Sequence, residues 1–472
     1  MAQPQRHGAG GLRVLRTERV APAPRELPEK ALPLNYLDAL WLHAQPVERV
    51  FFYRLGPGAD DVDAVLSRMV DSLSRALHAF YPLAGRVRRT PGENNKYELF
   101  YQPGDSVVFT VAEHDGVGVD ELATDDPREV TKIAQFLPKL PEGGAVLALQ
   151  VTVLLPERRG LALGVTVHHS ACDGVGSTHF LHTWAAACAG AKVPPEPPVI
   201  DRTVIRDRKE IRDVFTSPMN DAKELFKSPY VGKLLTTFTL SKENLQGIKD
   251  AVAGEAVRRG VPPPRCTSLI ATYGLMWHCL HRSAPESEAE RRVDGPAYFV
   301  FAADLRTRLE PTVPGKYLGN CVGPSFALAP KKELTATDAG GLFTACAAVA
   351  AAIDEVVRGE PPYWERWAER ILEASRDDIP FSVAGSTWFR VYGVDFGFGT
   401  PAKVEIVSAA KTSAMSMAED RGGSGGMELG IALTSERMER LRRCLADTIA
   451  WLSSSSTPPS GTRAESAEKF PN

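Results

Sequence analysis

The hydrophobic positions of the chain follow two spacings, one typical of helices and one typical of strands. Between residues 62 and 77, apolar side chains recur every three or four positions, which predicts an amphipathic helix. Asp60 and Asp61 precede it and suit the N-terminal cap and the positive end of the helix dipole. The apolar side chains of this predicted helix are Val62, Val65, Leu66, Met69, Val70, Leu73 and Leu77.

Two apolar runs near the middle of the chain predict a β-hairpin. Residues 146–155 (VLALQVTVLL) are uninterrupted, residues 156–160 (PERRG) suit a turn, and residues 161–169 (LALGVTVHH) resume the pattern. Similar patterns predict strands at 298–303, 403–409 and 427–433, and helices at 177–187, 268–281, 342–357 and 436–451. Because helices and strands are interspersed, the sequence predicts a mixed α/β fold.

A proline-rich stretch, residues 193–199 (VPPEPPV), divides the chain and is typical of a linker. A charged, irregular segment is expected after it, between residues 201 and 213. We therefore predict an N-terminal domain over residues 1–192, a crossover linker over 193–225 and a C-terminal domain over 226–452. Residues 453–472 are polar and rich in serine and proline, so we expect a disordered tail there.

Composition and charge exclude several classes of protein. With 55 Lys and Arg against 58 Asp and Glu, the chain has no positive excess to neutralise the phosphates of a nucleic acid. No run approaches the roughly 18 consecutive apolar residues of a membrane span, and the N-terminus lacks the apolar core of a signal peptide. The seven cysteines are odd in number and include no C-x-x-C pair, so we expect reduced, buried thiols. We expect a cytoplasmic protein with neither nucleic acid nor membrane as partner.

A histidine at the end of the predicted hairpin is the candidate catalytic group. Side chains alternate along a strand, so His169 shares a face with Val165 and Val167, while His168 points to the other side. The turn that follows, residues 170–174 (SACDG), ends in Gly174, which can adopt a positive φ that other residues resist.

An imidazole that titrates near neutral pH can take a proton from a hydroxyl group as that oxygen attacks a carbonyl carbon. The chain has no G-x-S-x-G elbow, and no cysteine has the electropositive neighbours of an activated thiolate. The residues therefore favour direct transfer between two bound substrates over a covalent intermediate.

Four histidines close in sequence raise the question of a metal site. His168 and His169 are expected to face opposite ways, and no carboxylate completes a zinc shell with His179 and His182. We predict no metal site.

Five separated motifs together resemble those of the plant BAHD acyltransferases, which use acyl-CoA thioesters. His169 to Gly174 has the form H-x-x-x-D-G, and residues 395–399 read DFGFG. Residues 80–86 (FYPLAGR), 32–42 (LPLNYLDALWL) and 304–308 (DLRTR) resemble three further elements of the family. Residues 317–321 (YLGNC) resemble the YFGNC element of the branch that acylates anthocyanins and other phenolic glycosides with malonyl or hydroxycinnamoyl groups.

The resemblance implies an α/β fold of two chloramphenicol-acetyltransferase-like domains, each a mixed sheet with helices, with a solvent tunnel at their interface and some strand exchange near residues 385–405. It implies that His169 is the general base, reached by acyl-CoA from one mouth of the tunnel and by a small-molecule acceptor from the other. Asp173 is then turned away from the tunnel and pairs with Arg306, so that Asp173, Gly174 and Arg306 support the site. Asp38 and Trp41 either border the tunnel or pack in the core.

The DFGFG loop is expected to shape the CoA side, away from the histidine. Its glycines permit a bend, Phe396 is expected to be buried, and a structural role is favoured over direct substrate contact. The residues of this loop are Asp395, Phe396, Gly397, Phe398 and Gly399.

Three departures from the family pattern bear on substrate choice. Phe398 stands where the family commonly has tryptophan, and Thr400 where a basic residue often follows. The turn at residues 174–178 has no cation for a malonate carboxylate, which favours a hydroxycinnamoyl over a malonyl donor. Two alternatives stay open: N-acylation of an amine or polyamine, and a weakly catalytic member that binds metabolites. The resemblance further implies a monomer that uses acyl-CoA as a co-substrate and needs no cofactor.

Overall fold

A computed structural model of the chain describes residues 11–455, except 25–26, 57–60, 156–158, 218–227, 286–294, 338, 360–362, 365 and 377–378. Three predictions therefore fall wholly or partly outside the described residues: Asp60 as a cap, the turn at 156–160, and the tail. The helix at the C-terminal end continues to Ser455, three residues beyond the predicted end of the folded part.

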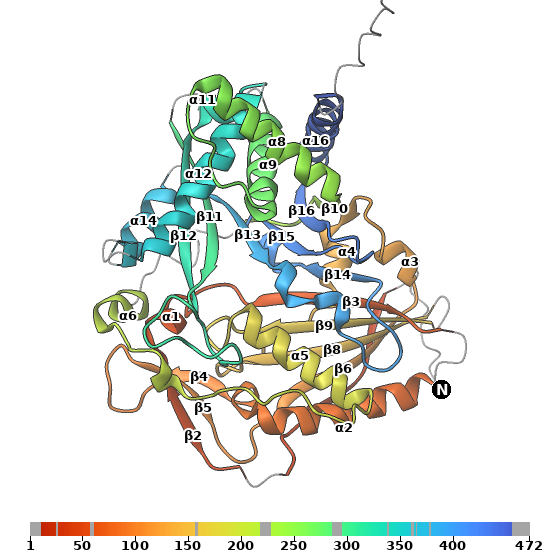
Figure 1. Cartoon of the computed structure of the whole chain (residues 1–472). Coiled ribbons are helices and arrows are strands. Elements are labelled where there is room, and N and C mark those ends of the chain that lie inside the picture. Colours follow the sequence, from red (N-terminus) through yellow and green to blue (C-terminus); the bar gives the residue numbers. More distant parts are fainter. Residues whose placement is uncertain are drawn as a thin grey trace, which may run out of the picture.

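Two large mixed sheets form the framework, and a small antiparallel sheet lies beside the first (Figure 1). The six-stranded sheet has the order β1 (Leu12–Val20), β6 (Val107–His114), β8 (Leu147–Leu154), β9 (Gly160–Val167), β3 (Val47–Arg54) and β14 (Lys403–Ile406). The seven-stranded sheet has the order β12 (Val322–Pro330), β11 (Pro296–Asp304), β13 (Phe381–Gly385), β15 (Ala414–Glu419), β16 (Met427–Thr434), β10 (Lys233–Leu240) and β7 (Arg128–Glu129). The small sheet has the order β2 (Lys30–Pro33), β5 (Tyr97–Tyr101) and β4 (Arg86–Arg89).

The predicted hairpin is confirmed as the antiparallel pair β8 and β9 at the centre of the first sheet. Every residue of both strands is buried, which explains why both are largely apolar; the exceptions, Gln150, Thr152 and Thr166, are buried and hydrogen-bonded. Leu163, Val165 and Val167 pack in the same core cluster as side chains of α2 and α5, whereas Ala162 packs in the cluster on the opposite face. The strand therefore has the alternation that the sequence predicts.

Helices cover the outer faces of both sheets. In Figure 1, α2 and α5 lie together below the first sheet, and α8, α9, α12 and α16 gather around the second. The helices are α1 (Tyr36–Ala39), α2 (Val62–Ala79), α3 (Val119–Leu122), α4 (Val130–Ala134), α5 (Gly174–Cys188), α6 (Lys209–Thr216), α8 (Lys242–Arg259), α9 (Ser268–Arg282), α11 (Lys331–Leu334), α12 (Ala339–Arg358), α14 (Trp367–Ala374), α15 (Ser408–Lys411) and α16 (Ser435–Ser455). Short 3-10 turns occupy Tyr81–Ala84, Arg202–Val204, Thr387–Phe389 and Val391–Gly393.

Within the described ranges, α12 is long and apolar enough to cross a membrane by length and composition alone. More than half of its apolar window, 56%, is buried inside the structure, where it packs against α8, α9 and β12. This packing on several sides accounts for its composition.

Each large sheet contains one strand from the other half of the chain. β14 follows the predicted C-terminal domain's strand β13 in sequence, yet it pairs with β3 in the first sheet. β7 comes from the N-terminal half and pairs with β10 in the second. The pairing of β14 agrees with the strand exchange expected near residues 385–405. The exchange of β7 was not predicted. The bounds of the two domains stay a prediction.

Three local expectations are wrong or incomplete. The segment expected to be irregular contains α6, because Ile211 and Phe215, four residues apart, pack together against the cluster that contains α1. The strand expected over 403–409 ends at Ile406 and gives way to α15, since β3 offers few further partners. Asp61 is the N-cap of α2 by position, but its side chain makes no capping hydrogen bond.

Candidate active site

His169 lies two residues beyond the end of β9, in the turn that leads into α5. The backbone N–H of His168 donates to the carbonyl of Val146, which extends the pairing of β8 and β9 to the base of this turn. The His168 ring contacts Ser170 at 3.1 Å, whereas the His169 ring contacts Asn320. The two imidazoles thus have separate surroundings, and the half-buried His169 ring is held at the end of a fully buried strand.

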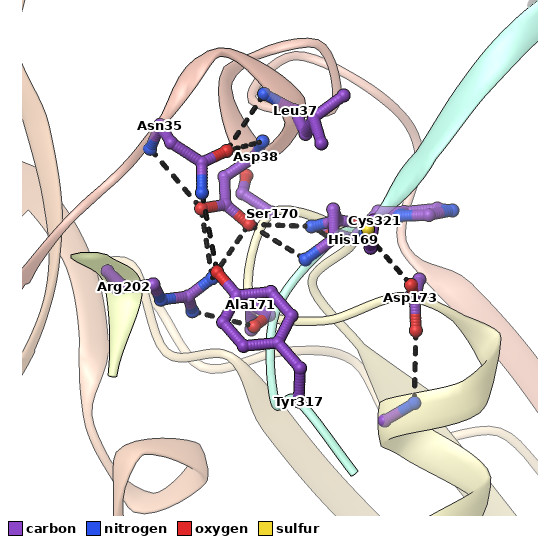
Figure 2. A network of polar contacts seen from close by, with 12 residues as sticks. Asn35, Leu37, Asp38, His169, Ser170, Ala171, Asp173, Arg202, Tyr317 and Cys321 are labelled. Carbon is purple, nitrogen blue, oxygen red and sulfur yellow. Dashed lines mark hydrogen bonds and ion pairs between the residues drawn. The ribbon is translucent and has the colours of Figure 1, made fainter. Parts of the chain in front are cut away.

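The side chain of Asn320 holds one nitrogen of His169. Nδ1 of the ring lies 3.2 Å from Oδ1 of Asn320. The amide nitrogen of Asn320 donates to the backbone carbonyl of His169 at 2.9 Å and to Oδ1 of Asp38 at 3.1 Å. Figure 2 shows Asp38 between Asn35, Arg202 and the residues around His169. Nε2 of His169 has no hydrogen bond within the described part of the chain.

Asp38 is buried at the end of a short capped helix and is paired with a buried arginine. Asn35 caps α1 by accepting from the N–H groups of Leu37 and Asp38, and the Asp38 carboxylate accepts from the N–H of Asn35 in return. Arg202 donates to both carboxylate oxygens at 2.8 and 2.9 Å and also to the carbonyl of Ala171, within the turn after His169. Burial raises the pKa of Asp38, and the Arg202 guanidinium opposes that rise.

The ring of Trp41 covers one face of the imidazole. Its centroid lies 3.8 Å from that of His169 and the planes differ by 7°. The indole N–H of Trp41 is buried and has no hydrogen-bond partner among the described residues.

Burial lowers the pKa of His169 to about 4, although its own backbone carbonyl, Asp173 and Asn320 act in the opposite direction. The imidazole is therefore neutral at neutral pH and can accept a proton.

The Asp173 carboxylate accepts hydrogen bonds from one side chain and two backbone N–H groups, and it forms the predicted ion pair. Arg306 donates to its two oxygens at 2.9 and 3.1 Å, and both side chains are almost fully buried. The carboxylate also accepts from the N–H of Gly176, as the N-cap of α5, and from that of Cys321. Since it makes no hydrogen bond to His169, its geometry accords with support of the turn.

Gly174 does not use the positive φ that is open to a glycine. It is the first residue of α5, and a Cβ there would lie 2.3 Å from the ring of Phe389. The glycine is required by the close approach of a side chain from the C-terminal half, which no local sequence pattern indicates.

The DFGFG loop packs at the far end of α5. Phe396 is buried against Trp184, as expected, and a Cβ at Gly397 would lie 3.0 Å from Ala189. Asp395 accepts from the N–H groups of Gly397 and Gly399, which have φ values of 92° and 114°. Fifteen residues of helix, about 22 Å at 1.5 Å per residue, separate this end of α5 from the turn that contains His169.

A buried arginine from β3 reaches the turn in which the sequence has no cation. Arg49, 4% exposed, donates to Thr178 at 2.9 Å and to Ser177 at 3.2 Å. No carboxylate of the described residues pairs with it, and its Nε has no hydrogen-bond partner. Burial lowers the pKa of Arg49 to about 10.

A small cavity between the two large sheets lies beside Arg49. Its space of about 20 Å³ suffices for a water molecule. Arg49 lines it from the N-terminal half, and Phe389, Val391 and Glu405 are among the residues that line it from the C-terminal half. His169 does not line this cavity. The tunnel that is expected to reach His169 therefore stays a prediction.

The thiols and histidines described near His169 do not favour a covalent intermediate or a metal site. Burial raises the pKa of Cys172 and of Cys321 to about 12, so neither thiol is activated. All seven cysteines are free, and six are buried, as expected. His179 and His182 contact the backbone carbonyls of Glu196 and Phe389, and the described residues contain no group of three or more potential metal ligands.

Sequence reasoning missed the roles of Asp38, Asn320, Arg202 and Arg49. Two of them lie within motifs that we had compared with a family, LPLNYLDALWL and YLGNC, and those motifs were the available signal. Arg202 and Arg49 lie in no motif, and only the fold brings them to the turn.

Known proteins resemble this chain over almost its whole length. A model of the Transferase family matches residues 12–446. The chain is 33% identical to phenolic glucoside malonyltransferase 1 of Arabidopsis thaliana, with 91% of this chain and 96% of that protein covered. It is 29% identical to agmatine coumaroyltransferase (91% and 97% covered) and 27% identical to coumaroyl-CoA:anthocyanidin 3-O-glucoside-6''-O-coumaroyltransferase 2 (90% and 95%), both of the same plant.

Among solved structures, vinorine synthase matches with a TM-score of 0.66 at 20% identity, with 93% of this chain and 98% of that one covered. This likeness confirms the predicted fold class of two chloramphenicol-acetyltransferase-like domains with mixed sheets. The match of the family model and the 33% identity together show that the chain belongs to the Transferase family, the BAHD acyltransferases.

Proposed function

We propose that this protein transfers an acyl group from acyl-CoA to a hydroxyl of a phenolic or flavonoid glycoside. Nε2 of His169 accepts the hydroxyl proton as the oxygen attacks the thioester carbonyl, and a new C–O bond forms. The C–S bond then breaks, and the CoA thiolate takes the proton back from the imidazolium. The observation that carries this proposal is a neutral imidazole whose Nδ1 is held by Asn320 and whose Nε2 has no hydrogen-bond partner among the residues that the structure describes.

The remaining site residues take supporting roles in this proposal. Asp173, Gly174 and Arg306 fix the turn that holds His169, and the loop over residues 395–399 shapes the CoA side. Acyl-CoA is a co-substrate and no cofactor is needed. We further propose that the protein is cytoplasmic and monomeric. Size-exclusion chromatography with light scattering would test the oligomeric state.

Arg49 supports a donor that carries a carboxylate, such as malonyl-CoA. A buried guanidinium without an anionic partner is costly unless a ligand supplies the missing charge. The carboxylates that line the adjacent cavity are engaged elsewhere, since Glu405 is bound by Arg128 and Glu428 by Tyr392. This reverses the preference for a hydroxycinnamoyl donor that the absence of a cation in residues 174–178 suggested.

An amine acceptor is a second candidate. The similarity to agmatine coumaroyltransferase supports it, because that relative's name specifies an amine. The same base serves either acceptor, so the identity of the product decides.

The test is an assay of the purified protein with malonyl-, coumaroyl- and acetyl-CoA against phenolic glucosides, anthocyanins and agmatine, with products identified by mass spectrometry. An acylated glycoside is expected, and His169→Ala should lower kcat by about 10²- to 10⁴-fold. Full activity of that variant would overturn the proposed mechanism. Ligand binding without turnover across the panel would instead support the weakly catalytic, metabolite-binding alternative.

A further inference from the structure

We propose that Asp38 is a positioning residue for catalysis: through Asn320 it sets which nitrogen of His169 carries the proton. This inference rests on the proposed function, because it assigns to Asp38 the task of leaving Nε2 of His169 unprotonated.

The first step concerns the orientation of the Asn320 amide. Oδ1 of Asp38 accepts from the backbone N–H of Asn320 at 2.9 Å and lies 3.1 Å from its amide nitrogen. The backbone carbonyl of His169 lies 2.9 Å from the same nitrogen. Both neighbours accept and cannot donate, so the NH₂ group faces them and Oδ1 of Asn320 faces the imidazole.

The second step concerns the tautomer. Since Oδ1 of Asn320 has no hydrogen to give, the 3.2 Å contact is a hydrogen bond only when Nδ1 of His169 carries the proton. Nε2 is then the nitrogen with the free lone pair.

The third step concerns what keeps Asp38 in place. Its contacts with Arg202 and with Asn35 are all with donors, so both carboxylate oxygens remain acceptors (Figure 2). Arg202 also donates to the carbonyl of Ala171, so the same ion pair is tied to the turn after His169. The residue in the H-x-x-x-D motif, Asp173, is occupied by Arg306 and cannot perform this task.

A carboxylate behind the amide also matters once the proton has been transferred. When Nε2 of His169 becomes protonated, Nδ1–H becomes a stronger donor, and the negative charge on Asp38 strengthens Oδ1 of Asn320 as its acceptor. The other groups near the imidazole are Asp173, His168 and the ring of Trp41. None of these forms a hydrogen bond to Nδ1.

The experiment measures the tautomer directly, by ¹⁵N NMR of protein labelled at histidine, with His169 assigned from the spectrum of His169→Gln. In the wild type, Nδ1 should be protonated and Nε2 not. Asp38→Asn keeps the shape but permits the Asn320 amide to turn over, so the population should shift toward Nε2–H. For this variant, kcat should fall at least about 10-fold with little change in KM.

Arg202→Lys is the matched control, because it weakens the same ion pair but keeps a cation beside the Asp38 carboxylate, so a charged carboxylate still faces Asn320. It should lower thermal stability and leave the tautomer unchanged. If Asp38→Asn does not fold, Asn320→Leu tests the same step by removing the acceptor.

An unchanged tautomer in Asp38→Asn or in Asn320→Leu would overturn the inference, as would a shift in Arg202→Lys equal to that in Asp38→Asn. Because this measurement needs no substrate, it is separate from the test of the proposed function. An active wild type with an unchanged tautomer in Asp38→Asn would overturn this inference alone.

Discussion

The indole of Trp41 lies parallel to the imidazole of His169, with ring centroids 3.8 Å apart. One face of the proposed base is therefore shielded from water and supported by an aromatic surface. A cation above an aromatic face is stabilised by the ring's quadrupole, so the stack favours the imidazolium that forms during the reaction. This stabilisation grows as the proton is transferred, which makes it a contribution to the transition state.

Trp41→Leu removes the aromatic face and should lower kcat about 2- to 30-fold, corresponding to about 0.5–2 kcal/mol of lost cation–π stabilisation. Trp41→Phe keeps an aromatic face and should retain most of the rate. Steady-state kinetics with one donor and one acceptor measure both variants. Equal kcat values for the leucine and phenylalanine variants would argue against a role for the aromatic face.

Arg306→Met should destabilise the fold by about 3–5 kcal/mol, because it leaves the buried Asp173 carboxylate without its counter-charge. Urea unfolding measures the change. Arg366→Met is the control, since its ion pair with Glu369 is at the surface, where solvent screens the charges and the effect on stability should be small. Similar losses in the two variants would contradict the structural role of the Asp173 pair.

Gly174→Ala should cost about 1–3 kcal/mol, because the new methyl group would overlap the ring of Phe389. Gly254→Ala, in the open middle of α8, should instead stabilise the protein by about 0.5–1 kcal/mol. Thermal unfolding of the two variants provides the comparison. A harmless Gly174→Ala would mean that Phe389 moves aside freely.

Arg49→Met should change donor preference more than overall activity. The loss of a charge-assisted hydrogen bond, about 1.5–3 kcal/mol, predicts a fall of about 10- to 100-fold in kcat/KM for malonyl-CoA relative to acetyl-CoA. Arg49→Lys, which keeps the charge, should restore part of the preference. If the methionine variant treats the two donors as the wild type does, Arg49 does not bind the acyl carboxylate.

Stability should fall as the solution is acidified below about pH 6.5. Burial lowers the pKa values of several histidines in the folded protein, so between about pH 6.5 and pH 4 the unfolded chain binds protons that the folded chain does not. Each such histidine steepens the fall by up to about 1.4 kcal/mol per pH unit. The histidines concerned are His168, His169 and His281, each with a pKa of about 4, and His179.

The free energy of unfolding, measured in urea at several pH values between 6.5 and 4.5, checks this prediction. His281→Gln lies outside the candidate site and should make the dependence shallower. The same low pKa of His169 predicts that kcat/KM stays level from pH 7 to about pH 5. An acidic limb centred near pH 6.5 would contradict it.

Regular local patterns made much of this fold predictable. The largely apolar runs predicted β8 and β9 because central strands are buried on both faces, and the end of β9 predicted the position of His169. The pair of Asp173 and Arg306 could be predicted only from resemblance to a family, since nothing local links residues 133 positions apart.

The contacts that define the site were beyond local reasoning. Asp38 meets Asn320 across 282 residues, and Arg49 meets Thr178 across 129. The first contact depends on how the two halves dock, and the second depends on how β3 and α5 pack within the N-terminal half. The reason for a glycine at position 174 could not be predicted either. The ring of Phe389, from the other half of the chain, excludes a side chain there, and the backbone angle does not.

The pairing of β14 with β3 has a consequence for the order in which the protein matures. During synthesis, the edge of β3 stays open until residue 406 has left the ribosome, by which time most of the chain has been made. An open strand edge invites pairing with other chains. The nascent N-terminal half therefore cannot be completed in isolation, and a truncated product that ends before β14 should depend on chaperones to stay dispersed.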